Sequence, residues 1–203
     1  MEKLFHSTFD FFNHALPGFC IVISLFILDP NLNTAQDFIA KANEIQIGGG
    51  IFLLIIGYIV GFGIHPIGRF MYIKLGFKIW KEKIKNDVPI FIAEKYIMVR
   101  EFSPRNFKYI ETWNMFCAMS HNLAIASLFS FTFTILKISV LKVANIGFWF
   151  SFALISLFLF FIFLYRAVKF SIWAADDLNA CVAKLKFIER TELFDKKQER
   201  DIE

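Results

Sequence analysis

Histidine and asparagine side chains stand inside or at the ends of long apolar segments of this chain, where polar groups are costly and often functional. His65 and Pro66 lie near the end of one apolar segment, and His121 and Asn122 lie at the start of another. Histidine titrates near neutral pH, and a proline removes one backbone hydrogen bond from a helix. These four residues are gate candidates. The alternative for His65 is an interfacial histidine that is hydrogen-bonded to a neighbouring helix, and His121 and Asn122 could equally bind a partner loop.

Another histidine stands at the start of the first apolar segment. Asn13 and His14 would lie at the membrane face where the second segment ends and the third begins. A polar cluster is therefore geometrically feasible, made of His14, His65, His121 and Asn122.

Hydroxyl side chains follow one face of the third apolar segment. Ser127, Ser130 and Thr134 recur with Ser120 at helical spacing. Such a stripe can line a hydrated pathway, but serine and threonine hydroxyls can also bond to the carbonyl four residues earlier in their own helix. The sequence leaves both interpretations open.

Glycines form a stripe along the second apolar segment. Gly57 and Gly61 make a GxxxG pattern, and Gly50 and Gly68 extend it at spacings that keep all four near one helix face. The pattern predicts close helix packing or a pore-lining face between subunits. Ordinary packing inside one chain is the simpler interpretation.

Lysines gather directly after the second apolar segment. This basic stretch could meet an anionic regulator such as a nucleotide, an oligonucleotide, an acidic partner protein or anionic lipid. Attraction to lipid headgroups is the simpler interpretation, and we do not expect direct nucleic-acid binding. The lysines concerned are Lys78, Lys81, Lys83 and Lys85.

Nothing in the sequence predicts an enzyme. It contains no HExxH, GxSxG, P-loop or GxGxxG motif. Cys20, Cys117 and Cys181 are far apart and form no CxxC or cysteine–histidine cluster. We therefore expect no catalytic residue, no metal site and no cofactor.

The elements that must position these residues are membrane helices. The 203 residues include 28 phenylalanines and are 57% hydrophobic, with a mean hydropathy of +0.54, which is too apolar for a soluble domain of this length. Four apolar runs are long enough to cross a bilayer: about 11–28, 48–69, 120–138 and 146–165. We predict an all-α integral membrane protein with four transmembrane helices and cytoplasmic helical extensions.

The distribution of basic residues predicts the orientation. Ten lysines and arginines lie from Arg69 to Lys108, whereas Lys41 is alone in the segment 29–47. By the positive-inside rule the middle loop and both termini are cytoplasmic. The predicted segments are 1–72 (two spans with a short outer loop), 73–118 (a basic cytoplasmic helical segment that continues the second span through Val88), 119–166 (a transmembrane hairpin) and 167–203 (a cytoplasmic helix with a frayed tail).

Three stretches carry a resemblance: PGFxxxxxxFILDP, GYIVGFGIHPIGR and EFSPRNFKYIETWNMFCAMSHNLA. In their order and content they resemble uncharacterised small four-span proteins of the bacterial inner membrane. More weakly, the size, the number of spans and the lack of enzyme motifs resemble transmembrane effectors and sensors of bacterial antiphage defence. The resemblance implies a multi-pass protein of the bacterial inner membrane and establishes no activity.

Four helices are too few to enclose a wide aqueous path alone. The leading hypothesis is therefore a homo-oligomer in the lipid bilayer, expected to be a tetramer, that forms or gates an ion pathway and is controlled from its cytoplasmic face, as a defence effector would be. The competing hypothesis is a non-conducting membrane scaffold or receptor that recruits a soluble partner protein.

Overall fold

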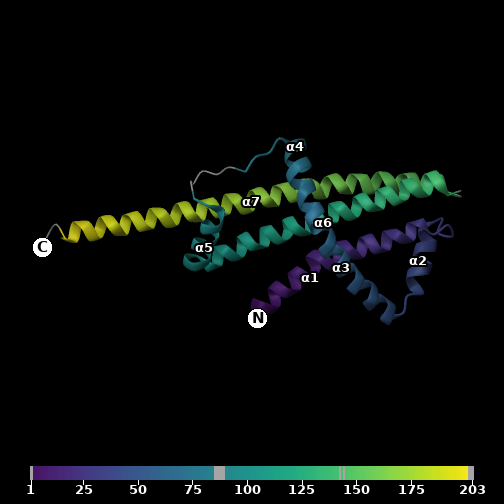
Figure 1. Ribbon diagram of the computed structural model, residues 1–203, viewed down its shortest axis with the longest axis horizontal. Helices are drawn as coiled ribbons and strands as arrows, with labels where there is room; N and C mark the ends of the chain where they lie inside the picture. The colour runs from purple at the N-terminus through teal and green to yellow at the C-terminus, as the bar shows by residue number, and fades with distance from the viewer. Residues whose placement is uncertain (1, 85–89, 142, 144, 201–203) are drawn as a thin grey trace. The chain divides into compact units, whose positions relative to one another are not determined.

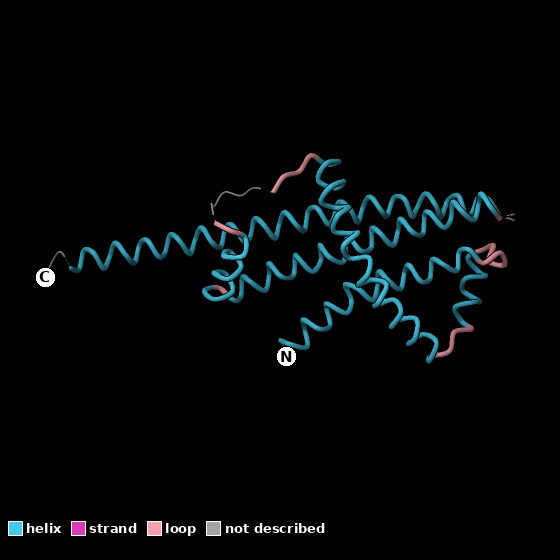
Figure 2. Tube along the Cα trace, viewed as in Figure 1, coloured by secondary structure: helices cyan, strands magenta, loops and turns pink. Residues whose placement is uncertain are grey.

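The structure is a computed structural model that describes residues 2–84, 90–141, 143 and 145–200, with the backbone alone for residues 2–10 and 187–200. Every regular element in this part of the chain is helical (Figure 1, Figure 2), which confirms the predicted all-α class. The helices are α1 (Glu2–Leu25), a 3-10 turn (Phe26–Leu28), α2 (Ala35–Asn43), α3 (Ile47–Met71), a π-helical turn (Tyr72–Gly76), α4 (Phe77–Trp80), α5 (Ile92–Phe102), α6 (Pro104–Val140) and α7 (Ile146–Arg200).

Four helical stretches are long and apolar enough to cross a membrane: Phe11–Leu28, Ile47–Trp80, Pro104–Val140 and Ile146–Lys186. The protein is therefore a multi-pass membrane protein. The last two stretches are longer than the apolar runs because α6 and α7 continue past them. Neither glycine nor proline occurs from 105 to 140 or from 148 to 200, so nothing in the sequence breaks these helices.

Helix α2 lies in the segment that the sequence predicts to be a short outer loop. Its start is fixed by a capping box, in which the Asp37 amide donates to Thr34 Oγ1 (3.3 Å) and the Thr34 amide donates to Asp37 Oδ2 (2.7 Å). Such reciprocal bonds satisfy donors at a helix start that would otherwise be unpaired. The signal is present in the sequence as Thr-Ala-Gln-Asp at 34–37.

The helix that continues the second span ends earlier than expected. After the π-helical turn, α4 reaches only Trp80, and Lys81 takes the left-handed conformation with φ of 53°. A left-handed residue commonly ends a helix. The expected continuation to Val88 therefore stops here, and Lys85 lies outside the described residues.

The chain divides into two compact units. Unit 1 comprises 1–81 with 115–168, and unit 2 comprises 82–114 with 169–203. In unit 1, α6 packs on α7 through Ala124, Phe160 and Leu164. Unit 2 has its own apolar core, in which the loop and the tail of the sequence meet, made of Val99, Ile110, Ala174, Leu178 and Val182.

Candidate polar site between three apolar helices

Glycines bring α1 and α3 into backbone contact. A Cβ atom at Gly18 would collide with the carbonyl oxygen of Gly57, and one at Gly61 would collide with the carbonyl oxygen of His14. Only residues without a side chain allow this approach. The GxxxG glycines of α3 are thus used for packing inside the chain, and Gly18 is the partner that the sequence analysis did not select.

A third glycine brings α3 to α6. A Cβ atom at Gly68 would lie 2.5 Å from His121 Nδ1 and 2.9 Å from the His121 carbonyl oxygen. Gly50, the fourth member of the predicted stripe, has open space around it. The stripe therefore places α1 and α6 against α3 from Gly57 to Gly68.

Three imidazole rings meet between these helices. The ring centroids of His14 and His65 are 5.2 Å apart, and those of His65 and His121 are 4.7 Å apart. Tyr72 stacks on His121 with a centroid separation of 5.3 Å and an interplanar angle of 7°. Each histidine comes from a different apolar helix, as the predicted cluster requires.

Asn122 ties the cluster together. Its Nδ2 donates to the backbone carbonyl of Asn13 on α1 at 3.0 Å, and the same atom lies 3.4 Å from Nδ1 of His65 on α3. Asn122 thereby joins α6 to both neighbours, and the structure places all four residues of the predicted cluster together. Pro66 also lies inside α3, but its side chain is exposed.

Three of the four residues are buried, His65 is half-buried, and the cluster is incompletely hydrogen-bonded. Asn122 is 0% exposed and His121 is 3% exposed. Among the described residues, Asn122 Oδ1 and His121 Nδ1 have no partner in hydrogen-bonding geometry. Buried polar atoms without a partner cost stability unless a water molecule or an ion satisfies them. The site, defined by His14, His65, His121 and Asn122, is called the histidine site below.

The edge of the histidine site is built by the π-helical turn. Tyr72 opens this turn and stacks on His121, with Cys117 beside it one turn before His121 on α6. Single π-helical turns inside α-helices are frequent at functional sites.

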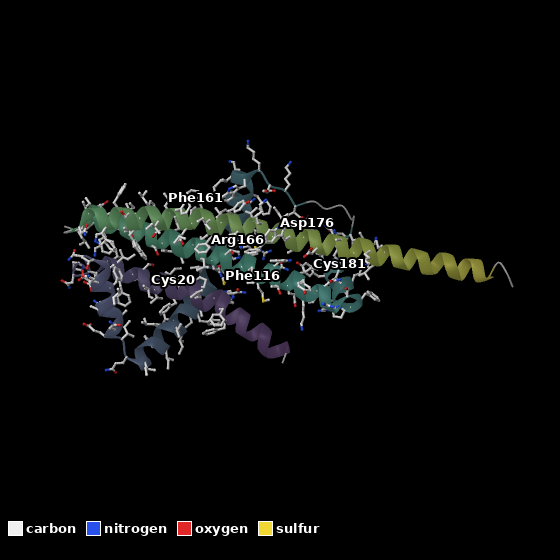
Figure 3. The ribbon with its side chains drawn as sticks, turned by 180° about the vertical axis from the view of Figure 1, so that it is seen from behind. Cys20, Phe116, Phe161, Arg166, Asp176 and Cys181 are labelled. Atoms are coloured by element: carbon white, nitrogen blue, oxygen red, sulfur yellow. The ribbon has the colours of Figure 1, made fainter. Side chains whose placement is uncertain are left out.

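Cys20 and Cys181, labelled in Figure 3, come from different helices, and all three cysteines are free thiols.

The hydroxyl stripe of α6 is bonded to its own helix. Ser127 Oγ donates to the carbonyl of Leu123 (2.9 Å), and Ser130 Oγ donates to that of Ala126 (3.1 Å). Thr134 Oγ1 donates likewise to Ser130 at 2.7 Å. Each hydroxyl thus donates to the carbonyl four residues earlier in its own helix, as one of the two interpretations expected. Because a hydroxyl has one hydrogen to donate, it cannot donate at the same time to water or an ion path.

A buried lysine lies at the other end of α6 and was not among the predicted site residues. Lys137 is 1% exposed, and its Nζ donates to the backbone carbonyl of Asp29 at 2.6 Å. Nζ also lies 4.5 Å from the ring centroid of Trp149, which is a cation–π contact. The signal available in the sequence was a lone lysine near the end of an apolar run.

The basic stretch after α3 is exposed. Lys78 on α4 and Lys81 and Lys83 beyond it all have exposed side chains, so the described lysines are accessible to an anionic ligand. Over the described residues, no group of three or more histidine, cysteine, aspartate or glutamate side chains could hold a metal ion.

Comparison of the chain with protein families, curated proteins and solved structures finds no match.

Proposed function

We propose that this protein is a homo-oligomer of the bacterial inner membrane that gates an ion pathway, with the histidine site as its gate. The observation that supports this proposal is the site itself: buried His14, His121 and Asn122 meet half-buried His65 between three apolar helices, with two polar atoms left unsatisfied among the described residues.

The cost of this arrangement favours a functional role. A buried polar atom without a partner costs roughly 1–3 kcal/mol, and apolar side chains at the same helix crossing would avoid that cost. Polar residues inside membrane helices commonly mark ion paths or proton relays for this reason. His65, next to Pro66, is the gate residue that we select first, because Asn122 links it to both other helices.

An oligomer would supply the additional helices that one chain lacks to enclose a pathway. Only 17% of the most apolar window of the α3–α4 span is buried within the chain, and Ile51, Ile55 and Ile59 of α3 are exposed. This face is open to lipid or to another copy. A ring of copies, with a tetramer as the expected number, would enclose a pathway. The resemblance to transmembrane defence effectors favours the inner membrane. The basic residues between Arg69 and Lys108 favour cytoplasmic termini and control through Lys78, Lys81 and Lys83.

Ion flux into liposomes tests the proposal. We expect purified protein to allow flux, and we expect His65→Leu and Asn122→Leu to reduce it at least tenfold because they remove polar atoms of the gate. Ser24→Ala is the matched control, since it removes a buried hydroxyl of α1 that donates to the carbonyl of Ile21 in its own helix. Flux that is unchanged in both site variants, or that matches empty liposomes for the unaltered protein, would contradict the proposal.

One observation favours the scaffold as a second candidate. Unit 2 has an apolar core and internal polar contacts: Lys95 Nζ to Asn179 Oδ1 (2.6 Å), Trp113 Nε1 to Asp177 Oδ2 (2.9 Å) and Asn114 Nδ2 to the Tyr96 hydroxyl (2.8 Å). A separately packed unit of this kind offers a defined surface for a soluble partner. A protein that binds such a partner and shows no flux in liposomes would be a scaffold.

A further inference from the structure

We propose that the ion bound at the histidine site is the proton, and that the three imidazoles hold one proton in common and pass it between α1, α3 and α6. This inference depends on the proposed function and names the ion that the pathway serves.

The ligand atoms of the site favour a proton over a metal cation. The described groups that face it are imidazole, carboxamide, phenol, thiol and guanidinium, and carboxylates are not among them. Hard cations such as Ca²⁺ and Mg²⁺ prefer several oxygen ligands, usually including carboxylates. Imidazole nitrogens instead accept and donate protons.

The charges around the site limit it to one proton at a time. His14 faces it from α1, His65 and Arg69 from α3, and His121 from α6. Two imidazolium rings whose centroids are 4.7 Å apart repel each other, and Arg69 adds another positive charge. A second proton at the site is therefore disfavoured.

The remaining groups at the edge are two phenols and a thiol. Tyr72 and Cys117 flank His121, and Tyr58 faces His14. The α7 residues packed beside Tyr72, Phe160 and Leu164, are apolar. The proton charge is thus exchanged among the imidazoles.

The unsatisfied atoms complete the site for proton transfer. Asn122 Oδ1 is an acceptor and His121 Nδ1 can accept or donate, so these neighbouring side chains can bond to each other or to a water molecule. When a proton binds one nitrogen of a ring, the ring can release the proton on its other nitrogen to the next acceptor, and the N–H bond formed balances the N–H bond broken. At the ring separations observed, transfer occurs directly or through one water molecule.

Separate flux measurements test which ion moves. Proton entry is measured in liposomes that contain a pH-sensitive dye, with a potassium diffusion potential set by valinomycin. Potassium and sodium fluxes are measured in parallel in liposomes without valinomycin. We expect proton flux without alkali-ion flux, and at least tenfold less proton flux in His121→Gln and His14→Gln, with Ser24→Ala unchanged. Potassium or sodium flux without proton flux would overturn the proton inference and leave the proposed gate intact.

A binding measurement separates the inference from the proposed function. In micelles, ¹⁵N-labelled histidine reports the protonation of each ring by NMR. We expect the titration of His65 to change when His121 is replaced by glutamine and to stay unchanged in Ser24→Ala. Independent titration of the rings would overturn the shared proton, even if ions flow. Coupled titration without any flux would remove the pathway and retain the proton-binding site.

Discussion

Gly61 shows how much of the histidine site depends on the absence of a single side chain. A methyl group there meets the backbone carbonyl of His14, which belongs to another helix and has no rotamer through which to move away. We expect Gly61→Ala to lower the free energy of unfolding by roughly 1–3 kcal/mol, as overpacking does in other protein interiors. Thermal unfolding in detergent measures the change.

Gly63 provides the control for that substitution. It lies in the same helix with nothing within 4 Å of an added Cβ atom, and alanine favours helix over glycine. Gly63→Ala should therefore leave the unfolding temperature unchanged or raise it. If Gly61→Ala unfolds at the same temperature as Gly63→Ala, α1 and α3 do not pack as closely as described.

At the scale of elements, two carboxylates hold α2 and the chain before it. The hydrogen bond from Lys41 lowers the pKa of Asp29, and the backbone amides of Asn33 and Thr34 lower the pKa of Asp37. A carboxyl group whose pKa is lowered on folding adds stability above its unfolded pKa and loses it as pH falls through the folded pKa. The contribution of both groups is thus present at neutral pH and lost in acid.

We therefore expect the segment 29–44 to open locally as pH falls below about 4, where an ordinary aspartate becomes protonated. Amide hydrogen exchange of this segment, corrected for the intrinsic pH dependence of exchange, should show the loss of protection. Asp37→Asn should reduce protection already at neutral pH, whereas Glu44→Gln, at the exposed end of α2, should not. Protection that is the same at pH 7 and in acid would contradict this interpretation.

At the scale of the whole molecule, the number of copies decides between the two proposed functions. Native mass spectrometry in gentle detergent should show a ring, expected to be a tetramer, because four membrane helices cannot surround a wide pathway. A bound anionic lipid or nucleotide would be detected in the same spectrum. A monomer would contradict the pathway and favour the scaffold.

The sequence by itself determined the class of this protein and the number of its spans. Both follow from local composition, because a stretch such as 146–165 must be apolar along its whole length to lie in lipid. It also indicated each member of the histidine site, since histidine and asparagine are conspicuous in apolar surroundings. The capping box of α2 was equally local and could have been recognised from Thr34 and Asp37.

Only the tertiary structure decided which of these residues meet. The contact of Gly18 with Gly57 joins residues far apart in the chain and brings His14 to His65. The burial of Lys137 depends in the same way on the distant Asp29 carbonyl and on Trp149. Helical periodicity specifies the face on which a residue lies, but the partner of that face depends on how closely two backbones approach, which is a property of both helices together.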